Sequence, residues 1–159
     1  MPFARRQPCI TGAARFSKTS ARDSKALKID NRGEAGLPPE FAALPADRMV
    51  VGSAQYTREA LYGLAELNES VHAAYTDDAG SEYQAFVLLQ TDEITADDTW
   101  QNLASRWQEI DLDGEPVLFR EVPYSGLVGV IRSNGKIIGV ADSADDEQLL
   151  DRLGRIAAR

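Results

Sequence analysis

Several residue types are scarce in this chain, and each shortage excludes a class of protein. One cysteine, Cys9, among 159 residues rules out an intrachain disulfide framework and a zinc site built from cysteines. One histidine, His72, leaves no second imidazole for a metal centre. No apolar run approaches the ~18 residues of a membrane-spanning helix. We therefore predict a domain held together by an apolar core, with no metal and no cofactor.

The net charge of the chain is −8, and its acidic and basic residues are unevenly distributed along the sequence. Residues 1–32 hold eight basic and two acidic side chains, a net charge of +6. The other 127 residues hold nine basic and twenty-three acidic side chains, a net charge of −14. Such an acidic body repels nucleic acid and anionic lipid. The basic segment has few aromatic side chains that could stack on bases, so nucleic-acid binding is not expected.

The composition divides the chain near residue 45. Residues 1–45 are predicted to form a basic, flexible tail and linker, rich in Arg, Ser, Thr and Ala and closing on a proline-rich stretch. The start of this segment resembles an organellar transit peptide in composition, and Arg5-Arg6 resembles a twin-arginine signal, but no apolar core follows. The compartment therefore stays open. Residues 46–159 are predicted to form a single α+β domain.

Hydrophobic periodicity predicts the secondary structure of this domain. Strands are expected over 48–56, 70–78, 81–91 and 117–122, with two more in the hairpin around Asn134-Gly135. Helices are expected where apolar residues recur every three to four positions. These helices start at Thr57 (with Leu61, Leu64 and Leu67), span 95–110 (with Trp100, Leu103 and Trp107), and close the chain (with Leu149, Leu153 and Ile156). The order β-α-β-β-α-β-β-β-α favours an antiparallel sheet of five to six strands with helices on one face.

Two acidic pairs look catalytic but have a structural explanation. Asp97-Asp98 and Asp145-Asp146 occur in the similar contexts TADD and SADD, each at the start of an expected helix. Thr95 or Ser143 as N-cap would satisfy free backbone N–H groups, and carboxylates in the first turn favour the positive end of the helix dipole. We therefore interpret both pairs as helix starts.

The glycine-rich stretch SGLVGVIRSNGKIIGV predicts a hairpin rather than a phosphate-binding loop. Its glycines do not follow the G-x-G-x-x-G pattern, whereas Asn134-Gly135 between apolar runs is typical of a type I′ turn. This turn pairs Ser133 with Lys136 and, further along, Gly129 with Val140. One face then carries Leu127, Gly129, Ile131, Ile138 and Val140, and the other carries Val128, Val130, Ile137, Gly139 and Ala141.

Both faces of this hairpin are apolar, so the second face also requires a cover. Gly129 and Gly139 each remove one side chain, which allows a ring or a backbone to approach closely. We expect the cover to be a homodimer partner, an apolar small ligand, or the N-terminal segment folding back. The candidate contact residues are Val128, Val130, Ile137 and Gly139, with Arg132 near the hairpin tip.

A competing hypothesis is a small hydrolase-like enzyme. His72 would act as the base, with Asp78 or Glu82 from the adjoining hairpin as its acidic partner. The hypothesis requires these groups to meet in a cleft with perturbed pKa values.

From about residue 44 to residue 158 the chain resembles a bacterial family of uncharacterised domains. LPADRMVVGSAQYTREALYG is similar to an LP–spacer–GS–x–x–Y opening, and AYTDDAGSEYQAFVLLQT and the Trp-Leu helix follow it. The resemblance implies an exported protein without an established activity, although this chain shows no export signal, and it supplies no catalytic residues. The hypothesis that follows is a non-enzymatic binding or assembly domain, which contacts a partner or an apolar ligand through one sheet face.

Overall fold

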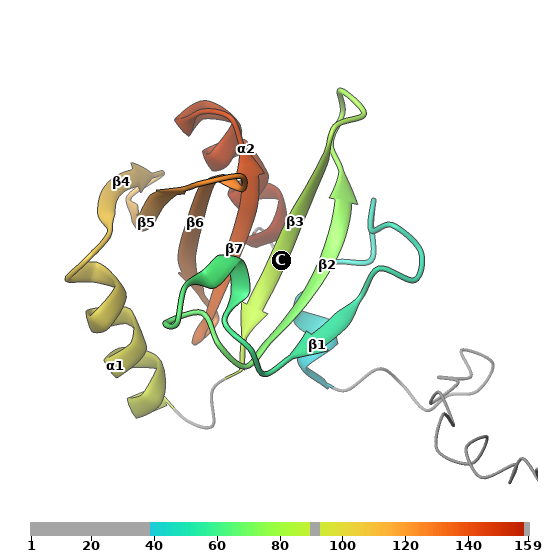
Figure 1. The fold of residues 1–159 in the computed structure, drawn as a ribbon. Helices are drawn as coiled ribbons and strands as arrows, with labels where there is room; N and C mark the ends of the chain where they lie inside the picture. Colours follow the sequence, from blue (N-terminus) through green and yellow to red (C-terminus); the bar gives the residue numbers. More distant parts are fainter. Residues whose placement is uncertain (1–38, 90–92, 158–159) are drawn as a thin grey trace, which may run out of the picture. The chain divides into compact units, whose positions relative to one another are not determined.

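The fold is one antiparallel sheet with a helix against each face (Figure 1). This computed structural model describes residues 39–89 and 93–157. The seven strands are β1 (Gln55–Thr57), β2 (Ser70–Thr76), β3 (Glu82–Leu88), β4 (Gln108–Leu112), β5 (Glu115–Val122), β6 (Gly126–Ser133) and β7 (Lys136–Ser143). The helices are α1 (Glu93–Ala104) and α2 (Asp146–Ala157), with the 3-10 helices η1 (Pro39–Ala43) and η2 (Leu61–Gly63). The sheet order is β1-β2-β3-β7-β6-β5-β4, which confirms the expected α+β class.

The β6–β7 hairpin has the predicted register. Ser133 pairs with Lys136, and Gly129 pairs with Val140. Asn134 and Gly135 have φ values of 52° and 74°, as a type I′ turn requires at both central positions. The turn chemistry therefore determines which side chains of the two strands share a face.

A second short turn adds a strand that the sequence analysis missed. The helix expected over 95–110 ends at Ala104, and residues 108–112 form β4 instead. Asp113-Gly114, with φ values of 54° and 91°, joins β4 to β5, and the Asp111 carboxylate accepts a hydrogen bond from the Gly114 N–H (3.0 Å). The Asp-Gly pair is itself a hairpin signal. Here the Asp-Gly turn determines the structure, although Trp100, Leu103 and Trp107 have the spacing of a helix.

The helix expected from Thr57 is also absent. Only η2 forms there, and Tyr62 within it has a φ of 53°, outside the helical region. Leu61, Leu64 and Leu67 are nevertheless buried, because backbone hydrogen bonds among these three residues fold the segment into a compact loop. The apolar spacing thus predicted the burial correctly and the backbone conformation wrongly. The first expected strand, 48–56, is reduced to β1 and one isolated bridge between Met49 and Tyr75.

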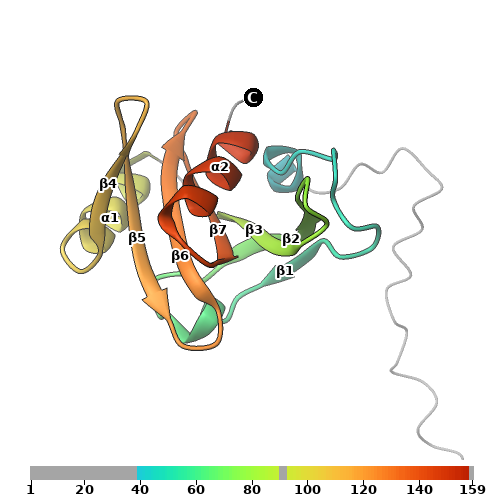
Figure 2. The ribbon, with the colours of Figure 1, turned by 90° about the horizontal axis from the view of Figure 1, so that it is seen from above.

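Each face of the sheet has its own core, which corrects the expectation of helices on one face only. Figure 2 shows α2 lying along β6 and β7. The first core joins α2 and η1 to the sheet and contains Phe41, Leu44, Val71, Tyr75, Val87, Ile138, Val140, Leu149, Leu153 and Ile156, among others. The second core lies under α1 and residues 61–67 and contains Leu67, Phe86, Trp100, Leu103, Val128, Val130 and Ile137, among others. The two alternating sets predicted for the β6–β7 hairpin fall into these two cores.

The two hairpin glycines make room for side chains from the rest of the chain. A Cβ added at Gly139 would lie 2.2 Å from Cζ of Phe86, and one added at Gly129 would lie 2.8 Å from Cδ1 of Leu149. The expected close approach of a ring is therefore confirmed, with Phe86 as the ring. The cover on each side comes from the chain itself.

The helix starts differ from the expected caps. Thr95 lies inside α1, which begins at Glu93. Asp145, rather than Ser143, caps α2, because its carboxylate accepts from the Gln148 N–H (2.9 Å). Ser143 is a buried residue at the end of β7. The interpretation of Asp145-Asp146 as a helix start holds, with a different residue as the cap.

A buried ion pair fastens α2 to the turn between β2 and β3. The Arg152 side chain is 1% exposed, and its guanidinium donates to the Asp77 carboxylate (2.8 Å) and to the Asp142 carbonyl (2.8 Å). Arg152 also lies 4.5 Å from the centroid of the Tyr83 ring. Asp77 accepts from the N–H groups of Ala79 and Ser81, so one carboxylate shapes the turn and binds the helix.

The folded part begins earlier than residue 46, because Phe41 and Leu44 belong to the first core. The rest of the expected tail, residues 1–38 with Cys9 and Arg5-Arg6, lies outside the described residues, as do the last residues of the strand expected over 81–91. Among the described helices, none has the length and apolar character needed to cross a membrane.

The contact between Gly139 and Phe86 predicts a strong, position-specific effect. Gly139→Ala should lower the free energy of unfolding by about 2–3 kcal/mol, because its Cβ overlaps a buried ring. Gly154→Ala, in α2 with open space around the added Cβ, should raise it by roughly 0.5–1 kcal/mol through the higher helix propensity of alanine. Urea denaturation of both variants measures the difference. Equal stabilities would contradict the packing described here.

The Arg152 pair predicts both a stability loss and a change in acid sensitivity. Arg152→Met should cost about 3 kcal/mol, because it leaves Asp77 without its buried partner. The hydrogen bond from Arg152, with those from the turn, holds the pKa of Asp77 below its ordinary value of 3.8. This stabilisation is complete above pH 3.8 and is lost as the pH falls through the lowered folded-state pKa.

Denaturation curves between about pH 6 and pH 3 should therefore fall less steeply with acid in Arg152→Met than in the unaltered chain. Arg155→Met is the matched control, because Arg155 pairs with Asp78 and Asp151 on the surface and should matter much less. A loss in Arg155→Met as large as that in Arg152→Met would count against the buried pair.

Candidate functional site

The apolar residues expected to contact a partner are buried inside the chain. Val128, Val130 and Ile137 have no exposed surface, and Gly139 is buried beneath the Phe86 ring. All lie on the face covered by α1 and by residues 61–67. Their burial corrects the expectation of an open second face, and a binding surface has to be sought elsewhere.

Arg132 contributes to the same internal cover. Its guanidinium lies 2.6 Å from the Asp97 carboxylate of α1. The pair joins the end of β6 to the helix above it. Arg132 is therefore engaged within the chain, and the charge of Asp97 has a structural partner.

The three residues of the enzyme hypothesis do not meet. Glu82 pairs with Thr76 across the β2–β3 hairpin, four residues along the strand from His72, which corresponds to about 13 Å. Asp78 lies in the turn beyond and is bound by Arg48 and Arg155. The structure thus brings neither carboxylate to the imidazole.

His72 itself lies in a half-buried position on β2. Its Nδ1 is buried and has no hydrogen-bond partner in the described part of the chain. Burial lowers the pKa of His72 below its ordinary value of 6.5. The imidazole is therefore neutral at pH 7, and no carboxylate raises its basicity.

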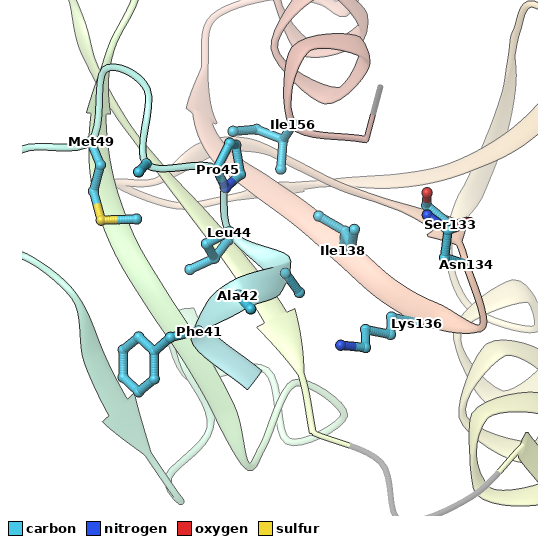
Figure 3. A pocket seen from close by; sticks show the side chains of 12 residues that line it. Phe41, Ala42, Leu44, Pro45, Met49, Ser133, Asn134, Lys136, Ile138 and Ile156 are labelled. Atoms are coloured by element: carbon cyan, nitrogen blue, oxygen red, sulfur yellow. The ribbon is translucent and has the colours of Figure 1, made fainter. Parts of the chain in front are cut away.

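A cavity of about 710 Å³ opens on the opposite face, beside α2 (Figure 3). Its walls come from four segments that are distant in the sequence. They are η1 with the turn that follows it, the tip of the β6–β7 hairpin, the inner part of β7, and the end of α2. The lining residues are Phe41, Ala42, Ala43, Leu44, Pro45, Ala46, Met49, Ser133, Asn134, Lys136, Ile138 and Ile156.

The segment 44–53, which contributes Leu44, Pro45, Ala46 and Met49 to the wall, is anchored to β2 by hydrogen bonds. The Tyr75 hydroxyl donates to the Pro45 carbonyl (2.6 Å), and the Val50 N–H donates to the Ala74 carbonyl (2.8 Å). Ser53 Oγ donates to the Val50 carbonyl (2.7 Å) and accepts from the Ala74 N–H (3.0 Å). Burial raises the pKa of Tyr75, which keeps its hydroxyl protonated as a donor. This wall is therefore fixed in place although it contains little regular structure.

Polar and apolar groups are separated within the cavity. Figure 3 shows Ile138 in the middle of the cavity, Ile156 and Pro45 above it, and Ser133, Asn134 and Lys136 at the hairpin side. The Ser133 hydroxyl already donates to the Ala157 carbonyl of α2 (3.3 Å). Lys136 is the charged residue among those that the structure places in the lining. The arrangement is an apolar hollow with a polar, cationic rim.

A smaller cavity of about 220 Å³ lies on the other side of Pro45 and Ile156. Arg48, Tyr83 and Arg155 line it, which suggests an anion site at first sight. Both guanidiniums, however, are bound to the Asp78 carboxylate, and Asp47 lies in the same lining. Its positive charge is thus neutralised within the chain, and the larger cavity is the better candidate.

The described residues offer no alternative chemistry for a metal. Among residues 39–89 and 93–157, no three acidic, histidine or cysteine side chains come together as a ligand set. The lining of the larger cavity also lacks histidine, cysteine and carboxylate side chains.

Sequence analysis missed most of this site because it assigned residues up to 45 to a linker. One signal could have indicated otherwise: Phe41 and Leu44 are spaced i, i+3 between prolines, as in a short apolar helix. Lys136 was recognised only as the strand partner of Ser133. The contribution of Ile156 beside them depends on how α2 packs, which no local pattern encodes.

The architecture defines an α+β protein with a seven-stranded antiparallel sheet. Comparison of the chain with protein-family models, with curated proteins and with solved structures finds no match. The resemblance to a family with an LP–spacer–GS–x–x–Y opening therefore stays a prediction.

The environment of His72 predicts a measurable titration. Because burial lowers its folded-state pKa, the folded protein should take up this proton at a lower pH than the unfolded chain does. Stability should accordingly decline as the pH falls below about 6.5. As the chain has a single histidine, its ring signals in an NMR titration are unambiguous. A measured pKa above 6.5 would indicate an acidic partner and would revive the enzyme hypothesis.

Proposed function

We propose that this protein is a non-enzymatic binding domain that takes an apolar small molecule into the cavity beside α2. The observation that carries the proposal is the cavity itself, about 710 Å³ with an apolar floor of Leu44, Ile138 and Ile156. Ligand sites in proteins are typically hollows of about 300–1,000 Å³ lined by apolar side chains with a few polar groups. Both the size and the lining agree with that description.

Apolar contact supplies the driving force for binding at this site. Half of the lining residues, including Leu44, Ile138 and Ile156, belong to or pack against the first core, so this apolar part is held in place before a ligand arrives. Transfer of apolar surface from water gains about 25 cal/mol per Å². A preformed apolar hollow therefore binds without a large ordering cost.

The cavity favours a ligand over the homodimer partner considered from the sequence. The second sheet face, where a homodimer partner was expected, is already covered by α1 and residues 61–67. The lining includes no acid–base pair, which supports binding without turnover. An apolar ligand was also expected from the sequence. The proposed site for it lies on the sheet face covered by α2, not on the face covered by α1.

Filling the cavity should weaken binding. Ala43 lines the hollow and is half-buried, so Ala43→Trp places an indole where the ligand would lie. Saturable binding of Nile red, a neutral apolar dye, should weaken about tenfold or more, which corresponds to about 1.4 kcal/mol. Dye fluorescence gives the affinity, and NMR chemical-shift changes at Ile138 and Ile156 give the location.

Ala104→Trp is the matched control, because Ala104 is exposed on α1 and lies outside the cavity lining. It adds the same indole and should leave the affinity unchanged. Unfolding curves establish that both variants are folded. Equal affinities of Ala43→Trp and the unaltered chain, or shift changes confined to another surface, would refute the proposal.

A further inference from the structure

The charge at the rim narrows the class of ligand, an inference that rests on the proposed function. We infer that the cavity binds a single-chain amphiphile with one anionic head group, a carboxylate for example. Its head pairs with Lys136, and its apolar chain lies over Ile138 and Ile156 toward Pro45. The argument depends on the charge, the position and the surroundings of Lys136.

Lys136 is a cation without an anion in the described part of the chain. No carboxylate among the described residues lies within ion-pair distance of its ammonium. The arginines on neighbouring elements differ, since Arg132, Arg152 and Arg155 each have an aspartate partner. In residues 33–159, with a net charge of −14, an unpaired cation beside a cavity is a distinct feature.

The position of Lys136 suits an amphiphile better than a wholly apolar molecule. Figure 3 shows its side chain extended along the cavity, with the nitrogen directed toward η1. Ser133 and Asn134 lie on the same side, whereas Pro45, Met49 and Ile156 supply apolar surface away from them. A molecule that reaches from the hairpin rim to this apolar surface meets a cation first and apolar walls afterwards.

The surroundings of Lys136 determine the sign of the preferred head group. An ammonium attracts a carboxylate and repels a second cation, and at an exposed side chain such as Lys136 this attraction is modest. A neutral head group would gain only a hydrogen bond. The expected preference is therefore anion over neutral over cation.

The acidic surface favours a free amphiphile over the same head group in a lipid bilayer. Residues 33–159 carry a net charge of −14, so the body of the protein is repelled by an anionic membrane. A monomeric molecule that enters the cavity alone avoids this repulsion. Anionic vesicles therefore serve as a separate arm of the test.

The test compares three probes of equal chain length on the full chain: dodecanoate and dodecylammonium below their micellar ranges, and dodecanol below its solubility limit. Isothermal titration should give a dodecanoate affinity about five- to tenfold above that of dodecanol, the gain of one charge-assisted contact at a partly exposed site. Dodecylammonium should bind most weakly. Anionic vesicles can attract residues 1–32, which carry a net charge of +6, so any vesicle binding should be the same in Lys136→Met as in the unaltered chain.

Three variants locate the charge effect. Lys136→Met removes the ammonium and retains the apolar stem. Dodecanoate and dodecanol should then bind this variant with about equal affinity. Lys136→Arg should retain the preference. Arg106→Met removes an exposed charge outside the cavity lining and should leave the preference unchanged, which controls for general attraction of anions.

The outcomes separate the inference from the proposed function. If neither dodecanoate nor dodecanol binds, and Nile red does not bind either, the proposed function fails. Equal binding of both probes, with no effect of Lys136→Met, would overturn the anionic head group and leave the binding domain standing. Binding to anionic vesicles that is lost in Lys136→Met would overturn the assignment to a free amphiphile.

Discussion

The buried pair of Arg152 and Asp77 is the interaction on which the arrangement around the cavity depends. It joins α2, the last helix, to a turn seventy-five residues earlier in the chain. The position of α2 sets the position of Ile156, and Ile156 forms one wall of the cavity. A buried ion pair contributes little net stability, because desolvation offsets much of the Coulomb attraction. The Nε of Arg152 also has no hydrogen-bond partner among the described residues. What the pair supplies is a fixed position for the helix.

The cavity exists because two segments that are each anchored to the sheet do not pack against each other. On one side, Arg152 and the apolar stripe of α2 hold the helix over β6 and β7. On the other side, the hydrogen bond from the Tyr75 hydroxyl to the Pro45 carbonyl and the one from the Ala74 N–H to Ser53 Oγ hold residues 44–53 along β2. Neither part can move across to fill the space without losing buried hydrogen bonds, each of which is expensive to leave unmade. A hollow bounded in this way persists without a ligand.

The sequence predicts those features of the fold that short-range chemistry determines. The register of β6 and β7 follows from Asn134-Gly135, and the allocation of Ile138 and Ile137 to opposite cores follows from strand alternation. The helix expected at Leu61 failed because tertiary burial of three leucines does not require helical backbone. The strand at 108–112 was missed because the spacing of Trp107 from Trp100 and Leu103 indicated a helix. The hairpin signal of Asp113-Gly114 was given less weight. Arg152 and the cavity involve contacts between distant segments, which no periodicity reveals.

The split between the two cores also explains why the cavity lies beside α2 rather than on the face expected from the glycines. Gly139 is filled by Phe86, a neighbour on the adjacent strand, so the missing side chain is replaced within the sheet itself. The space beside Gly129 is filled by Leu149, which comes from α2. Both glycines therefore serve internal packing. The unfilled space instead lies where η1 and α2 both end, because two short helices cannot cover all of a seven-stranded sheet. A binding site at such a margin requires no specialised motif, which is why the sequence alone did not indicate it.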